Sequence, residues 1–289
     1  MSARRRLFVA ASAAVMATSS LIAAFPLATL TLAALPGARV LTAEQQALAL
    51  EGMPATEREH TAALWADHAH VLPVAYVRAY FALERDEDGS ERLVQVGGYD
   101  VGPADSALRL PNVKTAGSGT GGRYDMYMSV SIWRTSNSGV YEWGIETYCD
   151  WRKGANGADA LCNQVEDTIS TSWAGDLYLY SDSGSGRCSS LLTPIYMYRS
   201  DMTPNEGVGW SYKEWMSVQP ACFLEDYARF AAYIRESTWK NRTDNVASQY
   251  LHSKGGTAEY TLSYKDASFT IVPANSNQWS AAAYTSFTH

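Results

Sequence analysis

The sequence predicts an all-β protein: a mainly antiparallel β-sandwich that follows a signal peptide and a short helical N-terminal element. Three observations predict this class. The chain of 289 residues is 46% hydrophobic and 18% charged, which is the composition of a folded protein with a sizeable core. From about Met126 onward, apolar and polar side chains alternate with a period of two. The alternating segments are short and are separated by turns rich in Gly, Asn, Asp and Ser, as in sandwiches and barrels.

Residues 1–38 have the features of a secretory signal peptide. Three arginines at positions 4–6 precede an uncharged stretch from 7 to 35, and small residues follow it. The uncharged stretch is longer than the usual h-region of about 7–15 residues, so an uncleaved N-terminal anchor is the alternative. We therefore expect a secreted, extracellular protein, with anchoring to a membrane through this segment as the other possibility.

The charge balance narrows the range of partners. The whole chain has a formal net charge of -7, which argues against a nucleic-acid partner, because phosphates demand a basic face. Residues 1–38 contain three arginines and no acid, so the remainder carries 20 Lys and Arg against 30 Asp and Glu, a net charge of -10. Anionic lipid headgroups would repel such a surface, so we expect no stable membrane insertion beyond the possible N-terminal anchor.

Residues 39–72 predict a short helical segment. Thr42 is suited to cap a helix over residues 43–50, with Gln45 at the capping-box position. A second helix is expected after Pro54, with Leu64 on its inward side. Neither helix is long enough to be stable without packing against the rest of the protein.

Residues 73–114 predict a β-hairpin. Its first strand alternates an apolar face with a more polar one, and the apolar face consists of Ala75, Val77, Ala79, Phe81 and Leu83. Residues 86–90 supply the turn, and residues 93–96 return as the partner strand. A flexible Gly/Ser-rich break at residues 115–122 then separates the hairpin from the predicted β-sandwich of residues 123–289.

The predicted sandwich contains many short strands. We expect them at residues 126–133, 141–149, 168–173, 176–181, 194–199, 208–216, 224–234, 246–252, 258–264, 268–272 and 278–287. The segment 224–234 fits both a helical and an alternating pattern, and its neighbours favour a strand.

All four cysteines lie in the predicted exported part, which is typical of structural disulfides in an oxidising compartment. The pairing Cys149–Cys162 with Cys188–Cys222 closes two short loops and is the one we favour among three connectivities. A zinc site built from the four thiolates is the alternative, but the sequence has no C-x2-C pair.

Part of the chain resembles functionally uncharacterised secreted bacterial β-rich proteins. The resemblance rests on the stretch DNVASQYLH at residues 244–252, the tryptophan-bearing strand pairs and the final strand through Gln278-Trp279-Ser280. It spans roughly residues 124–289 and implies export and a β-rich fold. It implies no catalytic residue.

Tyrosines on the predicted strands suggest a binding surface. Tyr178 and Tyr180 alternate with leucines, and Tyr196 and Tyr198 alternate with aliphatic residues in the same way. If these strands are neighbours, the four phenols form a flat ladder that Trp210 and Tyr212 could extend. Aromatic side chains of this kind suit sugar rings or peptide surfaces. The alternative is structural, because cross-strand Tyr pairs also stabilise sheets.

No motif in the sequence identifies a chemical reaction. His60, His68 and His70 gather near Asp67, which would allow a metal, but a solvated helix end is the simpler interpretation. Residues 117–122 match G-x-G-x-x-G by letter without the strand and helix that a nucleotide loop requires, and there is no G-x-S-x-G. We expect no metal and no cofactor.

The sequence therefore predicts an exported, non-catalytic binding protein that recognises an extracellular glycan or another surface ligand through aromatic side chains. A secreted hydrolase whose site forms only in the fold is the first alternative. A pore-forming or structural surface protein is the second.

Overall fold

The computed structural model describes residues 40–68, 70–89, 91–101, 124–135, 143–151, 166–174, 177–188, 193–213, 225–236, 243–252, 260–264, 267–271 and 279–288. The chain divides into two compact units, Met1–Thr31 and Leu32–His289, and all described residues belong to the second. The predicted signal peptide, the Gly/Ser-rich break and two of the cysteines, Cys162 and Cys222, lie outside the described residues.

Two helices open the described part of the chain, α1 (Ala43–Glu51) and α2 (Ala55–Trp65). The predicted capping box is confirmed, because the Thr42 hydroxyl accepts from the Gln45 backbone N–H at 3.2 Å. The Gln45 side-chain oxygen in turn accepts from the Thr42 backbone N–H at 2.8 Å. Pro54 precedes the first residue of α2.

The rest of the described chain is built of strands. In chain order they are β1 (Val71–Arg85), β2 (Glu91–Val101), β3 (Met126–Thr135), β4 (Trp143–Trp151), β5 (Glu166–Trp173), β6 (Leu177–Cys188), β7 (Thr193–Ile195), β8 (Met197–Thr203), β9 (Gly207–Lys213), β10 (Glu225–Glu236), β11 (Thr243–His252), β12 (Tyr260–Tyr264), β13 (Ala267–Ile271) and β14 (Trp279–Thr288).

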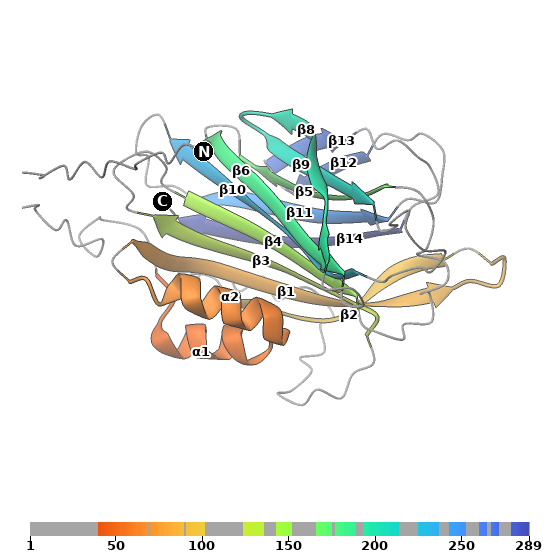
Figure 1. Ribbon diagram of the computed structural model, residues 1–289, viewed down its shortest axis with the longest axis horizontal. Helices are drawn as coiled ribbons and strands as arrows, with labels where there is room; N and C mark the ends of the chain where they lie inside the picture. Colours follow the sequence, from red (N-terminus) through yellow and green to blue (C-terminus); the bar gives the residue numbers. More distant parts are fainter. Residues whose placement is uncertain are drawn as a thin grey trace, which may run out of the picture. The chain divides into compact units, whose positions relative to one another are not determined.

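The strands form two antiparallel sheets and a separate hairpin (Figure 1). The seven-stranded sheet has the order β2-β1-β3-β4-β10-β6-β7, and the five-stranded sheet has the order β14-β11-β5-β9-β8. Among the described strands, β12 and β13 pair only with each other. The predicted all-β, mainly antiparallel sandwich with a short helical N-terminal element is therefore confirmed.

The main core lies between the two sheets. Val77, Ile132 and Ile145 of the seven-stranded sheet and Ile169 and Val246 of the five-stranded sheet are all fully buried in one cluster. These residues occupy the apolar positions of the alternating pattern. The apolar face of each strand is therefore the one that points into the core.

Three hydroxyls join the sheets inside this core. Thr147 of β4 lies 2.7 Å from the Thr171 hydroxyl of β5 and 2.8 Å from the Ser248 hydroxyl of β11. The last two hydroxyls lie 2.8 Å apart, which closes a triangle of hydrogen bonds. Buried hydroxyls satisfied in this way fix the position of one sheet against the other.

The segment with two possible patterns is a strand. In β10, Ala228, Phe230, Ala232 and Ile234 are fully buried and alternate with more exposed residues. The prediction of a strand is thus confirmed. Strand β10 pairs with both β4 and β6, so it is interior to the sheet.

Helices α1 and α2 cover the outer face of the sheet at β1 and β3. A second cluster of buried side chains lies there, and it includes Ala49, Met53 and Trp65 from the helical segment and Tyr76 and Trp133 from the strands. The Trp65 and Tyr76 rings meet edge to face, with centroids 6.3 Å apart. Figure 1 shows both helices on the side of the sheet that faces away from the five-stranded sheet.

Candidate functional site

A pocket of about 130 Å³ opens on the outer face of the seven-stranded sheet, beside helix α2. We call it the α2 pocket. Helix α2 supplies one wall, and strands β3, β4, β10 and β6 supply the rest. It is lined by His60, Leu64, Trp133, Glu146, Ser183, Ser185, Arg229, Ala231 and Tyr233.

The register of the strands explains why this part of the face is hollow. Glu146 of β4 lies opposite Ala231 of β10, and Ala231 lies opposite Ser183 of β6. Arg229 lies opposite Ser185 in the next outward row. Because β6 contributes only hydroxymethyl groups here and β10 contributes a methyl group, the floor is low beside the larger side chains around it.

One side of the pocket is polar. The His60 Nε2 atom lies 3.1 Å from the Glu146 carboxylate, and the exposed fractions of the two side chains are 37% and 8%. The Arg229 Nε–H donates to the Ser185 hydroxyl at 2.9 Å. These two pairs come from four different elements, so the fold itself brings them together.

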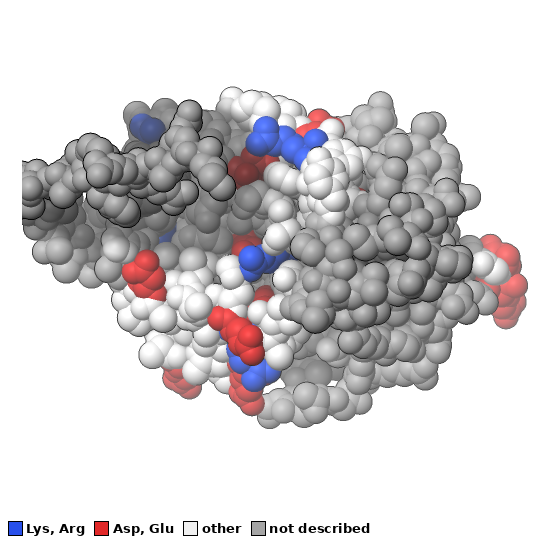
Figure 2. All heavy atoms as spheres, in the orientation of Figure 1, with Lys and Arg blue, Asp and Glu red and all other residues white. Residues whose placement is uncertain are grey.

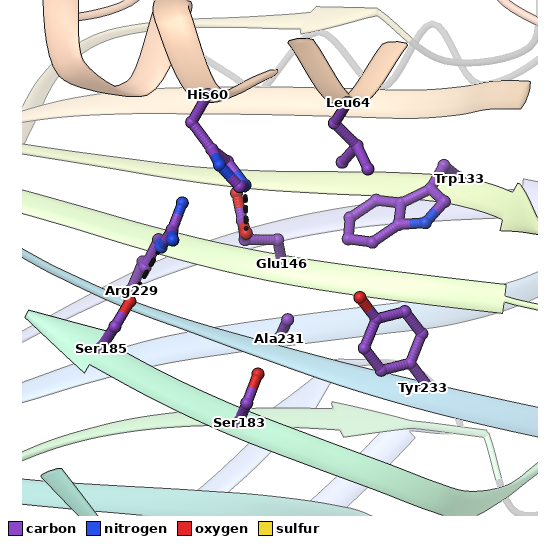
Figure 3. Close-up of a pocket in the computed structure, with 9 residues that line it drawn as sticks. All are labelled: His60, Leu64, Trp133, Glu146, Ser183, Ser185, Arg229, Ala231 and Tyr233. Atoms are coloured by element: carbon purple, nitrogen blue, oxygen red, sulfur yellow. Dashed lines mark hydrogen bonds and ion pairs between the residues drawn. The ribbon is translucent and has the colours of Figure 1, made fainter. Parts of the chain in front are cut away.

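The other side of the pocket is aromatic. The rings of Trp133 and Tyr233 meet edge to face, with centroids 6.0 Å apart. Gly144 lies between them in the register, opposite Trp133 of β3 and Tyr233 of β10. A Cβ atom at Gly144 would overlap the Trp133 indole, so this ring position requires glycine. Figure 3 shows the two aromatic rings on one side and the polar ends of His60, Glu146 and Arg229 on the other.

A buried polar cluster lies next to the pocket, under helix α2. The Ser129 hydroxyl donates to Glu57, and the Tyr76 and Tyr127 hydroxyls lie 2.6 Å apart. Glu57 is only 2% exposed, and burial raises the pKa of its carboxyl to about 8. The negative charge of Glu146 raises that pKa further. Glu57 is therefore protonated at neutral pH, and it belongs to the contact between α2 and the sheet, not to the pocket lining.

Charges around the pocket are mixed. On the face drawn in Figure 2, acidic and basic side chains are interspersed among the described residues. In the lining of the pocket itself, Arg229, Glu146 and His60 are the described ionisable groups apart from the Tyr233 phenol.

The structure separates the tyrosines that the sequence grouped together. Tyr178 and Tyr180 belong to β6 of the seven-stranded sheet, whereas Tyr198 belongs to β8 of the five-stranded sheet, directly after Tyr196 and Met197. The condition for one ladder, that these strands be neighbours in a sheet, is therefore not met. Tyr196 is 81% exposed, and its ring stacks on that of Tyr198 with centroids 6.3 Å apart.

Trp210 and Tyr212 do not extend a solvent-exposed ladder of tyrosines. Tyr212 is fully buried in the core between the sheets, and Trp210 packs against the same core. The Trp210 Nε1–H donates to the Asp182 carboxylate at 2.7 Å. The expectation that these two side chains lie on an outer surface is wrong, because the alternation of β9 places them on the inward face with Val208.

Sheet topology removes one disulfide connectivity. Strand β10 lies between β4 and β6, which carry Cys149 and Cys188. Two strand spacings place the Cα atoms of these cysteines at least about 10 Å apart, beyond the 4.4–6.8 Å or so that a disulfide spans. The favoured pairing uses Cys162 and Cys222, which lie outside the described residues, so it stays a prediction.

The histidines near the end of α2 point to different partners. His60 contacts Glu146 in the pocket, and the His70 Nδ1 atom lies 3.0 Å from the Asp67 carboxylate. Across the described parts of the chain, no three His, Cys, Asp or Glu side chains come together as a metal site.

Sequence reasoning missed the α2 pocket, because its walls come from strands that pair out of sequence order. The usable signal was local: segments 181–185 and 229–233 each place small or polar residues on the face opposite the core. Nothing in a single sequence shows that β10 joins β4 to β6.

Comparisons with known proteins add little. No protein-family model matches the chain, and no curated protein matches it. Within the described residues, neither helix is long and apolar enough to cross a membrane.

Among solved structures, similarity is found to one titled "Pore forming protein", with 6% identity, 71% of this chain and 95% of that chain covered, and a TM-score of 0.29. A structure titled "pH-induced modulation of Streptococcus parasanguinis adhesion by Fap1 fimbriae" has 9% identity and a TM-score of 0.23, with 56% of this chain and 78% of that chain covered. The Clostridium perfringens NetB toxin in its membrane-inserted form has 8% identity and a TM-score of 0.20, with 73% of this chain and 95% of that chain covered. TM-scores this low support no inference about this chain.

Proposed function

We propose that the protein is an exported, non-catalytic binding protein that recognises a carbohydrate in the α2 pocket. The observation that carries the proposal is the division of one pocket into a hydrogen-bonding side and an aromatic side. A sugar ring has the same division, because hydroxyl groups surround a ring whose C–H groups form apolar faces. Aromatic side chains suit the apolar faces, and a few fixed polar groups orient the ligand.

The size of the pocket favours a single sugar unit. Its volume of about 130 Å³ is below the roughly 300–1,000 Å³ of pockets that enclose drug-sized ligands. A terminal or isolated monosaccharide fits this scale better than a long oligosaccharide.

The lining is also prepared for hydroxyl groups. The Glu146 carboxylate is held by His60 at 3.1 Å and keeps further lone pairs for ligand hydroxyls. Ser183 lies exposed on the floor between Ala231 and the outer edge of the sheet, where its hydroxyl can donate and accept. Groups that are fixed before the ligand arrives lose less entropy on binding.

A pocket-filling variant tests the proposal on the full chain. Ligand-observed NMR with a panel of monosaccharides is expected to show binding to the wild type. Ala231→Phe, which fills the floor, is expected to abolish it. The matched control is Tyr196→Ala, which removes an 81% exposed ring between β7 and β8, outside the pocket lining, and is expected to leave binding unchanged. Thermal melting checks that both variants are folded.

Two results would contradict this proposal. Binding that survives Ala231→Phe and disappears in Tyr196→Ala would place the ligand on the Tyr196–Tyr198 surface. Breakdown of a bound glycan by the wild type, absent from the Ala231→Phe variant, would make the pocket a hydrolase site.

A further inference from the structure

We infer that the ligand of the α2 pocket carries a carboxylate, and that the Arg229 guanidinium binds it, so that the ligand class is an acidic sugar. This inference rests on the proposed function and specifies its ligand. It depends on the state of Arg229, on the geometry of the guanidinium and on the charges around it.

Arg229 is a cation without an acidic partner among the described residues. Its Nε–H donates to the neutral hydroxyl of Ser185, and no carboxylate oxygen of the described chain lies within 4.0 Å of it. Two other arginines, Arg199 and Arg92, differ in this respect. Arg199 bonds to the Asp182 carboxylate, and Arg92 lies 3.4 Å from Glu84 and 3.6 Å from Asp86.

The Ser185 contact orients the guanidinium, and no other described residue bonds to its terminal N–H groups. A guanidinium carries five N–H donors, and the bond to Ser185 uses only the one on Nε. The four N–H groups on the two terminal nitrogens form a planar fork that matches a carboxylate with two parallel hydrogen bonds. A serine partner thus orients Arg229 without neutralising it.

The surrounding charge favours a monoanion. Glu146 lies on the next row of the same sheet face and carries a negative charge, which His60 contacts at 3.1 Å. A dianion such as a phosphate monoester would be repelled by Glu146 and would find one arginine to balance it. A carboxylate places a single charge on the Arg229 side, with the Glu146 row left to ligand hydroxyls.

The rows of the sheet also set the orientation of the ligand. The carboxylate lies over Arg229 and Ser185, the hydroxyls lie over Glu146 and Ser183, and the apolar ring face turns towards Tyr233. A sugar acid carries these three kinds of group on one ring, which is why we prefer it to a simple organic acid.

The test uses the full chain and three probes: D-glucuronic acid, D-glucose and D-glucose 6-sulfate. Isothermal titration is expected to show at least about tenfold tighter binding of glucuronic acid than of glucose. Raising the salt from 20 to 200 mM should reduce this preference, because it is electrostatic. In Arg229→Gln the two sugars should bind equally, since the amide has no charge. Arg229→Lys should keep part of the preference, because it retains the charge without the fork.

The matched control is Arg92→Gln, which removes the same charge from an exposed site at the β1–β2 hairpin and should keep the full preference. If glucose and glucuronic acid bind equally to the wild type and both are lost in Ala231→Phe, the inference of a carboxylate is wrong. The proposed function would then still stand. If D-glucose 6-sulfate binds as tightly as D-glucuronic acid, the preference for a carboxylate over other monoanions is wrong. Absence of binding by every sugar would overturn both proposals.

Discussion

The outer face of the seven-stranded sheet has two halves that differ in their cover. Over β1 and β3, helix α2 closes the face, and Glu57 of the helix is buried against Ser129 and Tyr127 of β3. Over β10 and β6, helix α2 forms only one wall, through His60 and Leu64, and Arg229 and Ser183 line the α2 pocket. Each half has an ionisable side chain beside a serine hydroxyl: Glu57 of α2 with Ser129 on the covered half, and Arg229 with Ser185 on the other.

The difference shows what cover does to a polar side chain at this face. Under the helix, Glu57 is desolvated and its pKa rises to about 8, so it acts as a neutral hydrogen-bonding group. On the other half, the Arg229 Nε–H donates to the Ser185 hydroxyl, and we propose that its terminal N–H groups bind the ligand. Glu146 lies on the border, where His60 of α2 reaches it.

The largest expected effect concerns Glu57 and pH. Its carboxyl has a pKa of about 8 in the folded protein and 4.5 as an ordinary carboxyl, so the unfolded state loses this proton first. The contribution to stability is complete below pH 4.5 and falls as the pH rises towards 8, by up to about 5 kcal/mol in total. Glu57→Gln, which is neutral at every pH, should lack this fall and be more stable than the wild type at pH 8.

Urea unfolding of both proteins at pH 5, 6.5 and 8 measures the effect, because the difference between them cancels the other titrating groups. Glu84→Gln is the control, since Glu84 is 48% exposed at its side chain and should change the slope little. Parallel stability curves for the wild type and Glu57→Gln would show that Glu57 is ionised in the folded protein. The claim that the cover of the helix keeps this carboxyl neutral would then be wrong.

The next effect concerns Gly144, on the border between the two halves. Gly144→Ala places a methyl group where the Trp133 indole lies, so the ring must move. Overpacking of this kind costs about 1–3 kcal/mol. Because Trp133 forms the aromatic side of the pocket, sugar binding should weaken in the same variant.

Gly209→Ala is the control for this substitution. A Cβ atom at Gly209 would lie 3.5 Å from the Ser200 hydroxyl, an ordinary contact, so stability should change much less. Equal destabilisation by the two variants would mean that the alanine acts through the strand backbone and not through Trp133.

Much of the fold follows from the sequence because it depends on local alternation. The inward residues of β1, among them Val77 and Phe81, and those of β3, among them Ile132, are the ones that the period of two selects. The capping box at Thr42 is equally local. These features need only neighbouring residues, and a single sequence contains them.

The candidate site does not follow from the sequence because it depends on strand order. Asp182 and Trp210 meet across two sheets, and Tyr178 lies in a different sheet from Tyr198, although the alternation of each strand alone treats them alike. Alternation gives two faces for a strand but does not say which face is covered by another layer. The expectation that Tyr212 lies on an outer face is therefore wrong, because its side chain is in the core.

The smallest expected effects come from a matched pair of serines, one on each half. Ser129→Ala removes the hydroxyl that donates to Glu57 from a site only 1% exposed, and should cost about 1 kcal/mol or more, because a buried acceptor loses its donor. Ser183→Ala removes an exposed hydroxyl on the pocket floor and should change stability by less than about 0.5 kcal/mol. Its effect should appear in sugar binding instead. Chemical denaturation and titration of both variants measure the two quantities, and a stability loss at Ser183 equal to that at Ser129 would mean that both halves of the face are structural.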